Sequence, residues 1–599
     1  MSSGWLALMG LALVGGGAWA GELYVSPTGS DAAAGTRQAP LATLAHARDL
    51  ARQQPATSIL LLDGTHYLAE PLVLTSADSG LTITAAEGAH PVVSGGLRLT
   101  LAWRPYRDGI WQATTPADLA IDQLFVDGVR EPMARYPNYD ATVRHFNGWA
   151  ADAFSPERAA RWANPAGGYI HAMHVHEWGD YHYRITGKDA ANKVSYEGGW
   201  QNNRQMGMHP RYRMVENIFE ELDAPGEWFH DAKANTLYYY PRTGVELGRA
   251  TVEVVRLRHL VELRGSQADP VRRIALRGLT FRHAARTFMD NREPLLRSDW
   301  TTYRGGALHF VGSEDCEVAD CFLDQLGGNA IFVDKYNRRL TVRGCRIENA
   351  GANGVAFVGD PAAVRSPLFE YGQRQSLAQI DREPGPKTDN YPADCLVEEC
   401  LITRSGRVEK QTAPVQIAMA QGITVRHCSI YDVPRAGINI GDGCWGGHLI
   451  EWCDIFDTVL ETGDHGSFNS WGRDRYWGLT DAPEALLPEL ARLDAVRPII
   501  MRHNRWRCDH GWDIDLDDGS SNYEITGNLL LNGGLKLREG FGRVVTGNIT
   551  VNNTLHPHVW YANCGDRVTG NLFMAAYRPA GGMPPGRWGQ EIDRNLFTR

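Results

Sequence analysis

Hydrophobic and polar positions repeat in one short frame through the second half of the chain. An apolar residue is followed by two mostly polar ones, then by Cys or Asn, then by a second apolar stretch, as in Val397–Ile402 and Val545–Thr550. The Cys or Asn positions are Cys321, Cys345, Cys400, Cys428, Cys453, Asn504, Asn528, Asn548 and Asn571. They recur at short, similar intervals except across two longer gaps, 345–400 and 453–504. Such a short, strand-rich period is typical of stacked coils, so we predict an all-β fold, a right-handed parallel β-helix.

The Cys and Asn positions should form one ladder that faces the interior of the solenoid. Its Cys members should be buried free thiols, and its Asn members should hydrogen-bond from coil to coil. The ladder also gives a reference position from which to count along each coil. Asn439, Asp464 and Asp515 each follow a ladder position at the same interval. In register, these three residues would share one outward-facing column. Neighbouring coils are about 4.8 Å apart, so the two carboxylates would be about 5 Å apart.

The segment around Asp515 has the alternation of a strand with one wet face. Ile514 and Leu516 alternate with Asp513, Asp515 and Asp517. Three carboxylates on one face repel one another, so another group must offset that cost.

The next coil supplies two candidate cations, Lys536 and Arg538, in alternation with leucines. Among crowded carboxylates, one carboxyl group should have a raised pKa and keep its proton beside an ionised partner. This arrangement predicts a catalytic pair, Asp464 and Asp515, with Glu461 and Asp518 as further candidates.

Substrate-binding residues are expected around this pair. Trp471 and Arg473 follow Asp464 in a long loop, 467–498, where an aromatic ring can stack on a sugar and a guanidinium can hold a hydroxyl or carboxylate. The full predicted set is His465, Trp471, Arg473, Asn439, Asp513, Asp517, Lys536, Arg538 and Trp178. We predict no metal or cofactor, although the Asp-x-Asp-x-Asp spacing is also that of a Ca²⁺ loop. Apolar residues at the x positions fit a strand better.

The rest of the chain divides into four segments. Residues 1–20 have the apolar run and Ala-x-Ala site of a secretory signal peptide, so we expect a secreted or periplasmic protein. Residues 21–100 should form an N-terminal cap and the first coils, with a helix at 45–53. The non-repeating residues 101–253 should form an inserted β-rich, sandwich-like module. Residues 254–599 should form the main parallel β-helix with the active site, including a helix at 483–493 that Pro488 kinks or splits.

Composition and charge limit the classes of molecule that the protein is expected to bind. The net charge of −10 and the lack of a long basic stripe argue against nucleic-acid binding. After residue 20, no apolar run is long enough to predict a membrane span. We expect a monomer with a carbohydrate substrate.

Several motifs resemble glycoside hydrolase family 141. They are Tyr24–Pro27 with Gly29–Asp31, Ala134–Asn138, Asp464–Gly466 and Ser470–Tyr476. The last two are the most specific, and the motifs together span nearly the whole chain after residue 20. The resemblance implies a parallel β-helix, α-L-fucosidase or xylanase activity on a plant or algal glycan, and two catalytic aspartates on adjacent coils, at Asp464 and Asp515.

Three functions stay open at this point. A glycoside hydrolase would use Asp464 and Asp515 as acid and as nucleophile or base. A polysaccharide lyase acting on a uronate-containing glycan would need a base such as Lys536, and often Ca²⁺. A non-catalytic glycan-binding β-helix is the third, but a pure binder gains little from stacked carboxylates.

Overall fold

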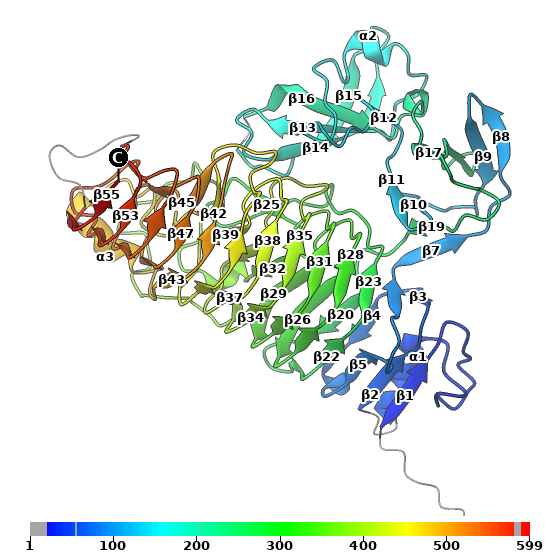
Figure 1. Ribbon diagram of the computed structural model, residues 1–599, viewed down its shortest axis with the longest axis horizontal. Helices are drawn as coiled ribbons and strands as arrows, with labels where there is room; N and C mark the ends of the chain where they lie inside the picture. The colour runs from blue at the N-terminus through cyan, green and yellow to red at the C-terminus, as the bar shows by residue number, and fades with distance from the viewer. Residues whose placement is uncertain (1–20, 54–56, 205, 580–588, 599) are drawn as a thin grey trace, which may run out of the picture.

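The computed structural model describes residues 21–53, 57–204, 206–579 and 589–598. The predicted signal peptide, residues 1–20, lies outside these ranges. The protein is a long β-solenoid whose strands stack from the N-terminal to the C-terminal end, with a second β-rich body beside it (Figure 1).

Three long sheets, A, B and C, form the sides of the solenoid, and every pairing along them is parallel. Sheet A consists of β1 (Glu22–Val25), β2 (Ser58–Leu61), β5 (Thr82–Ala85), β22 (Ala275–Arg277), β27 (Glu317–Ala319), β30 (Thr341–Arg343), β34 (Leu396–Glu398), β37 (Thr424–Arg426), β40 (Leu449–Glu451), β43 (Ile499–Arg502), β46 (Tyr523–Thr526), β49 (Val544–Thr546), β52 (Arg567–Thr569) and β54 (Glu591–Asp593). Sheet B consists of β3 (Thr65–Tyr67), β6 (Val92–Ser94), β23 (Thr280–Arg282), β28 (Phe322–Asp324), β31 (Arg346–Glu348), β35 (Leu401–Thr403), β38 (Ser429–Tyr431), β41 (Asp454–Ile455), β44 (Arg505–Trp506), β47 (Leu529–Leu530), β50 (Ile549–Thr550), β53 (Leu572–Phe573) and β55 (Leu596–Phe597).

Sheet C carries the site described below. Its strands are β4 (Leu72–Leu74), β20 (Val261–Arg264), β26 (Leu308–Glu314), β29 (Ile331–Arg338), β32 (Val355–Val358), β36 (Val415–Ala418), β39 (Ile438–Ile440), β42 (Gly466–Ser470), β45 (Trp512–Leu516), β48 (Leu535–Leu537) and β51 (Leu555–Pro557), with β21 (Val271–Arg272) and β33 (Pro392–Ala393) at its margin. The predicted parallel β-helix is confirmed.

One apolar core runs through the coils from Leu23 to Phe573, because each coil turns alternate side chains of its strands inward. The N-terminal helix α1 (Leu44–Gln53) adds Leu44 and Ala47 to the first coils, as predicted. The second predicted helix is split at its proline: a 3₁₀ turn, η4 (Glu484–Leu486), leads into α3 (Leu487–Ala491).

The Cys/Asn ladder lies inside the solenoid as predicted. All ten cysteines are buried and free. Asn504 accepts a hydrogen bond from the Cys453 backbone N–H at 2.9 Å, and Asn528 accepts one from the Asn504 N–H at 3.1 Å. The same contact continues down the ladder through Asn548 and Asn571. Each amide thus satisfies a buried backbone donor of the coil before it, which fixes the register between coils.

Strands between residues 96 and 255 form three antiparallel sheets, which we call the module. One sheet has the order β11 (Val129–Glu131), β10 (Leu124–Val126), β19 (Val252–Val255) and β7 (Gly96–Leu99). A second has the order β12 (Arg135–Tyr136), β16 (Met208–Glu216), β13 (Tyr169–His174), β14 (Asp180–Lys188) and β15 (Val194–Gly198). A third has the order β17 (Trp228–Asp231), β18 (Thr236–Tyr239), β9 (Ile110–Thr114) and β8 (Arg104–Arg107).

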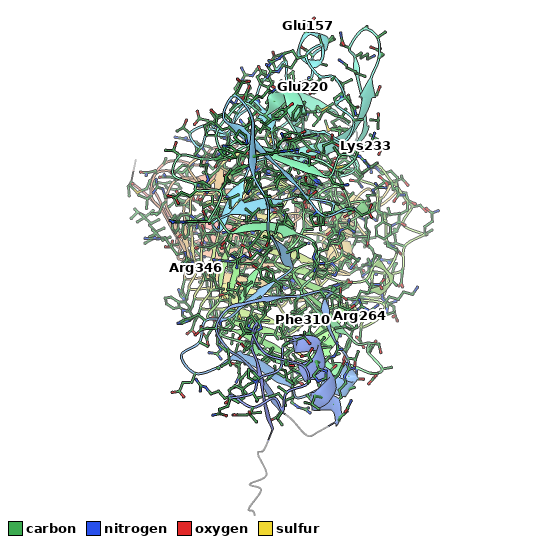
Figure 2. The ribbon with its side chains drawn as sticks, turned by 90° about the vertical axis from the view of Figure 1, so that its right-hand side faces the viewer. Glu157, Glu220, Lys233, Arg264, Phe310 and Arg346 are labelled. Atoms are coloured by element: carbon green, nitrogen blue, oxygen red, sulfur yellow. The ribbon has the colours of Figure 1, made fainter. Side chains whose placement is uncertain are left out.

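The module stands over one side of the solenoid. Seen from the end of the molecule, it rises above the coils, with Glu157 and Glu220 at its outer end, while Arg346 of sheet B and Arg264 of sheet C lie on opposite flanks below it (Figure 2). The short helix α2 (Pro156–Ala159) belongs to this outer end.

We predict that Asn528→Ala will destabilise the protein by about 3 kcal/mol, because it removes a buried amide and leaves several buried polar groups without partners. The exposed Asn552, which makes one side-chain bond to Asn532, is the control, and Asn552→Ala should cost no more than about 0.5 kcal/mol. Urea unfolding midpoints measure both. Equal shifts for the two variants would refute the structural role of the ladder.

Candidate active site

Four neighbouring strands of sheet C bring four polar side chains into one column. Asn439 of β39 pairs in register with Asn469 of β42, Asn469 with Asp515 of β45, and Asp515 with Lys536 of β48. The prediction that Asn439 and Asp515 share a column, with Lys536 beside them, is therefore confirmed. The prediction that Asp464 lies in that column is wrong, because Asn469 occupies its place.

The reason is a longer turn in one coil. The interval from the ladder residue Cys453 to Asn469 is longer than the interval from Cys428 to Asn439. The extra residues enlarge the turn before β42, where Val459 and Asp464 have φ of 57° and 54°. A β-branched residue in the left-handed region is strained, and such strain is often found at functional sites. The turn holds Asp464 above the column, and its side chain is 52% exposed.

The ammonium group of Lys536 is the centre of the site. Its Nζ lies 3.0 Å from an oxygen of Asp515, 3.4 Å from one of Asp517 and 3.6 Å from one of Asp464. Because all three oxygens lie within 3.6 Å of this one nitrogen, any two of them are separated by at most twice that distance. The predicted acidic cluster therefore forms, although Asp464 reaches it from a turn and not from a strand.

The carboxyl groups around Lys536 have different electrostatic environments. Complete burial raises the pKa of Asp515 well above its ordinary value, and the charges of Asp517 and Asp464 add to this, although Lys536 opposes it. Asp517 is also desolvated, but Lys536, Arg538 and other cations outweigh this and lower its pKa to about 2. An acid that retains its proton thus lies beside an ionised one. Lys536 loses hydration on burial, but the three aspartates more than compensate and raise its pKa.

Two arginines hold the next carboxylate. Arg473 Nε donates to Asp518 at 3.0 Å, and Arg538 lies 3.0 Å from the other oxygen of Asp518 and 3.1 Å from Asp517. Burial and the neighbouring Asp517 raise the pKa of Asp518, while both arginines lower it.

A cavity of about 210 Å³ opens beside this cluster. Its lining comes from the coils, from three long loops and from the module: Trp178, Arg204, Asp299, Trp300, Tyr371, Arg435, Asp464, His465, Asn469, Trp471, Arg473, Asp517, Asp518 and Arg538. Seven of the predicted site residues and the further candidate Asp518 are among them. Asp515, Lys536 and Asn439 lie beneath this lining and are 0% exposed.

The module forms part of the cavity wall and is bound to the turn that carries Asp464. Arg144 donates hydrogen bonds to the carbonyl oxygens of Leu460 and Thr462, at 2.6 and 3.0 Å. The backbone N–H of Gly463 donates to the carbonyl of Glu177, next to Trp178, at 2.8 Å. These contacts hold the segment that carries Trp178 against the turn of Asp464, so that Trp178, one of the predicted site residues, lines the same cavity as Asp464.

Two predicted residues have structural roles. Both oxygens of Asp513 accept backbone N–H groups, from Cys508, Asn532 and Gly534, so Asp513 holds the turn around β45 and does not reach the cavity. The Glu461 carboxylate accepts from the Phe146 N–H at 2.7 Å and pairs with Lys410 at 2.8 Å. Both carboxylates are already occupied by the protein.

His465 lines the cavity as a neutral imidazole. Its burial, and then the charges of Arg435 and Lys536, lower its pKa well below the ordinary value. Nδ1 lies 3.3 Å from the Thr462 hydroxyl, which itself donates to the Pro434 carbonyl. Thr462 therefore accepts from Nδ1–H, which leaves Nε2 as a hydrogen-bond acceptor.

Several lining residues were not predicted: Arg204, Asp299, Trp300, Tyr371, Arg435 and Asn469. Trp300 and Tyr371 come from the long loops at 286–304 and 360–394, which the sequence marks as insertions without showing where they pack. Arg435 precedes β39 and follows Pro434, and nothing in its local pattern distinguishes it from a solvent-exposed arginine.

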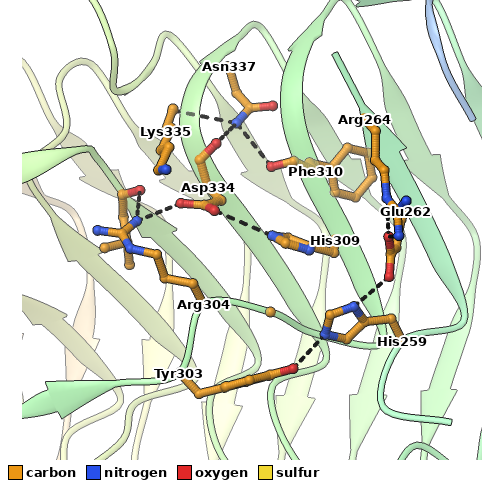
Figure 3. Close-up of polar contacts among 12 residues, drawn as sticks. His259, Glu262, Arg264, Tyr303, Arg304, His309, Phe310, Asp334, Lys335 and Asn337 are labelled. Atoms are coloured by element: carbon orange, nitrogen blue, oxygen red, sulfur yellow. Dashed lines mark hydrogen bonds and ion pairs between the residues drawn. The ribbon is translucent and has the colours of Figure 1, made fainter. Parts of the chain in front are cut away.

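In the coils nearer the N-terminus, the charged side chains of sheet C pair with other side chains of the protein. Glu262 pairs with His259 at 2.7 Å, and Asp334 lies 3.5 Å from His309 and also pairs with Arg304 (Figure 3). Tyr303 completes this group by a 2.8 Å contact with His259 (Figure 3). The charges of these coils are therefore neutralised within the protein. The acidic cluster that borders the cavity lies farther toward the C-terminal end of sheet C.

Within the described ranges, no group of three or more His, Cys, Asp or Glu side chains is arranged to hold a metal ion. At the acidic cluster, the Lys536 ammonium occupies the point on which the three carboxylates converge. The same ranges contain no helix that is long and apolar enough to span a membrane.

No protein-family model and no curated protein match the chain. Among solved structures, one described as a glycoside hydrolase matches with a TM-score of 0.64 and 18% identity, over 96% of each chain. XylC in complex with xylose matches with a TM-score of 0.40 and 12% identity, over 93% of this chain and 69% of that chain. The GH136 lacto-N-biosidase of Eubacterium ramulus matches with a TM-score of 0.34 and 10% identity, over 96% and 67%. The first similarity establishes a shared fold.

We predict that Lys536→Met will destabilise the protein by about 3–5 kcal/mol at pH 7, because it removes the buried cation that helps to neutralise the ionised Asp517 and that pairs with Asp515. The pKa of Asp517 is about 2 in the folded protein and ordinarily 3.8, so its stabilising contribution is present above pH 4 and is lost as the pH falls toward 2. The variant should therefore approach the stability of the wild type as the pH falls from 7 to 3.

Urea unfolding at the two pH values measures this difference. Lys335→Met is the control, because Lys335 is 41% exposed and its pairing distance to Asp360 is 3.8 Å; it should cost no more than about 0.5 kcal/mol at either pH. A Lys536→Met deficit that stays constant from pH 7 to pH 3 would contradict the assigned ion pairs.

Proposed function

We propose that the protein is an exported glycoside hydrolase that cleaves a plant or algal oligosaccharide or polysaccharide, with an α-L-fucoside or a xylan-like glycan as the substrate to test first. The observation that carries the proposal is the cavity lined by Asp464 and Asp517, whose carboxylates both lie within 3.6 Å of Lys536 Nζ. Glycoside hydrolysis needs two carboxyl groups that flank the same glycosidic bond, one to donate a proton and one to act as base or nucleophile.

We assign the two roles by accessibility and charge. Asp464 is half-exposed at the mouth of the cavity and is placed to give a proton to the glycosidic oxygen. Asp517 lines the cavity, stays ionised between Lys536 and Arg538, and acts as the base or nucleophile. Asp515, which the sequence suggested for one of these roles, is completely buried and outside the cavity lining. We assign it to positioning Lys536 and Asn469, to which it is bonded at 3.0 and 3.1 Å.

A polysaccharide lyase fits the site less well. A lyase whose base is a lysine or an arginine needs that side chain to accept a proton from the sugar ring, so the side chain must be neutral at the working pH. Lys536 is buried among three aspartates that raise its pKa, and Arg473 and Arg538 are likewise held charged by carboxylates. None of these groups is available to take a proton.

The walls of the cavity favour the end of a glycan over its middle. Trp300, Trp178 and Tyr371 all line the cavity, each from a different segment of the chain. The volume of about 210 Å³ is below the roughly 300–1,000 Å³ of pockets for drug-sized ligands. We therefore propose that the enzyme removes terminal sugars.

We predict that Asp464→Asn and Asp517→Asn will each lower kcat about 10²–10⁴-fold while the protein stays folded, because each removes one proton-transfer or nucleophilic group. Asp457→Asn, an exposed residue in the coil of Asp464, should retain full activity. The assay is release of reducing sugar from aryl α-L-fucosides, xylo-oligosaccharides and a panel of plant and algal glycans.

Full activity in both cavity variants would end the proposal. A product that absorbs in the ultraviolet, as an unsaturated uronate does, would identify a lyase instead. Binding of glycans without turnover on any of them would identify a non-catalytic glycan-binding protein.

A further inference from the structure

We infer that Arg435 binds an acidic group of the substrate, a carboxylate or a sulfate carried by the terminal sugar. The inference rests on the proposed function for the identity of the site, and it narrows the substrate class: among plant and algal glycans, those whose terminal sugar carries a negative charge, such as a sulfate ester or a uronate, are preferred to their neutral counterparts. It begins with the way in which this guanidinium is buried.

Arg435 is one of three arginines among the largest fully buried side chains of the described residues. The other two have carboxylate partners: Arg475 pairs with Asp494 at 2.9 Å, and Arg543 pairs with Asp566. For Arg435, no carboxylate of the described residues lies within ion-pairing distance. Its contacts are two neutral amide oxygens, those of Asn439 and Asn469, each at 3.1 Å.

A buried cation without an anion is costly, because it has lost its hydration and gained no opposite charge. The rings of Trp300 and Trp471, 4.6 and 5.7 Å from the guanidinium carbon, return only part of that cost, through cation–π contacts. Burial lowers the pKa of Arg435 to about 9, so the group is still charged at neutral pH. Asp515, Asp299 and Asp517 act on this charge only from beyond ion-pairing distance. A charged group without an ion-pair partner in a cavity wall is a place for a ligand anion.

The unsatisfied atoms around Arg435 are hydrogen-bond donors. Arg435 Nε, Asn439 Nδ2 and Trp471 Nε1 are buried without a partner in the protein. Donors of this kind are complementary to a group that only accepts hydrogen bonds, which describes a carboxylate or a sulfate and not a sugar hydroxyl. Arg435 and Trp471 both line the cavity that holds Asp464 and Asp517.

The other cations of the cavity are already neutralised. Arg473 and Arg538 are bound to Asp518, and Arg204 lies 3.4 Å from Asp299. Lys536 is shared among three aspartates. Within the described residues, Arg435 is thus the cavity cation that remains for a substrate.

The test measures binding directly, by titration calorimetry on the full chain. The acidic probes are D-glucuronate, D-galacturonate and D-galactose 6-sulfate, and the neutral probes are D-glucose, D-galactose, L-fucose and D-xylose. We expect at least one acidic sugar to bind at least 10-fold more tightly than its neutral counterpart. The sulfate and carboxylate probes decide between the two sources of negative charge.

The Arg435→Gln variant should lose at least 10-fold in affinity for the acidic probe and keep its weak affinity for the neutral ones. Arg502→Gln, at an exposed residue that pairs with Glu451 in sheet A, is the control and should bind as the wild type does. If Arg435→Gln does not fold, the wild type alone still decides, because D-glucuronamide should bind at least 10-fold more weakly than D-glucuronate.

Equal affinity for acidic and neutral sugars, or a variant that folds and still distinguishes them, would overturn the inference. Failure of the hydrolase proposal has a separate signature, since an acidic sugar would then bind through Arg435 but no glycoside would be cleaved. Cleavage of acidic glycosides at an undiminished rate by Arg435→Gln would leave the hydrolase standing and remove the acidic-sugar assignment.

Discussion

The buried ammonium group of Lys536 is the interaction on which the site depends. Asp515 and Asp517, which alternate along one strand and its end, would repel each other and Asp464 if no cation lay between them. The lysine compensates for that repulsion, but the two strand carboxyl groups respond differently. Asp517 also has Arg538 and Arg473 near it and is ionised, whereas the completely buried Asp515 beside Lys536 keeps its proton. Lys536 thus stabilises the cluster, and the arginines near Asp517 make its protonation state differ from that of Asp515.

The coil-to-coil register delivers these groups to one place. Asn504 and Asn528 fix the vertical alignment inside the solenoid, and sheet C then repeats that alignment on its outer face. This explains why counting from the ladder located Asn439 and Asp515 correctly from the sequence. It failed for Asp464 because the count assumes equal turns, and the turn before β42 is longer than its neighbours. The β-helix and its acidic cluster were therefore predictable, whereas a turn that departs from the repeat was not.

The lining residues that the sequence did not predict were missed for a different physical reason. Arg204 belongs to the module, and Trp300 and Tyr371 belong to long loops, so their positions depend on how separate parts of the chain dock. Docking is decided by contacts such as those of Arg144 with the carbonyl oxygens of a turn that lies far from it in the sequence. Neither periodicity nor spacing contains that information.

The division between coils and walls separates chemistry from recognition. The strands hold Asp515, Lys536 and, at the end of β45, Asp517 in a rigid register, so a change in the loops of Trp300 or Tyr371 can alter the shape of the cavity without moving these groups. Asp464 differs, because its turn is bonded to the module. Arg435 lies between the two sets: it is bonded to Asn439 and Asn469 of the coils and is covered by Trp300 from a loop. A charge in that position is fixed as firmly as the acidic cluster and yet faces the space that the walls enclose. It can therefore select a substrate by charge, while the aromatic walls select it by shape.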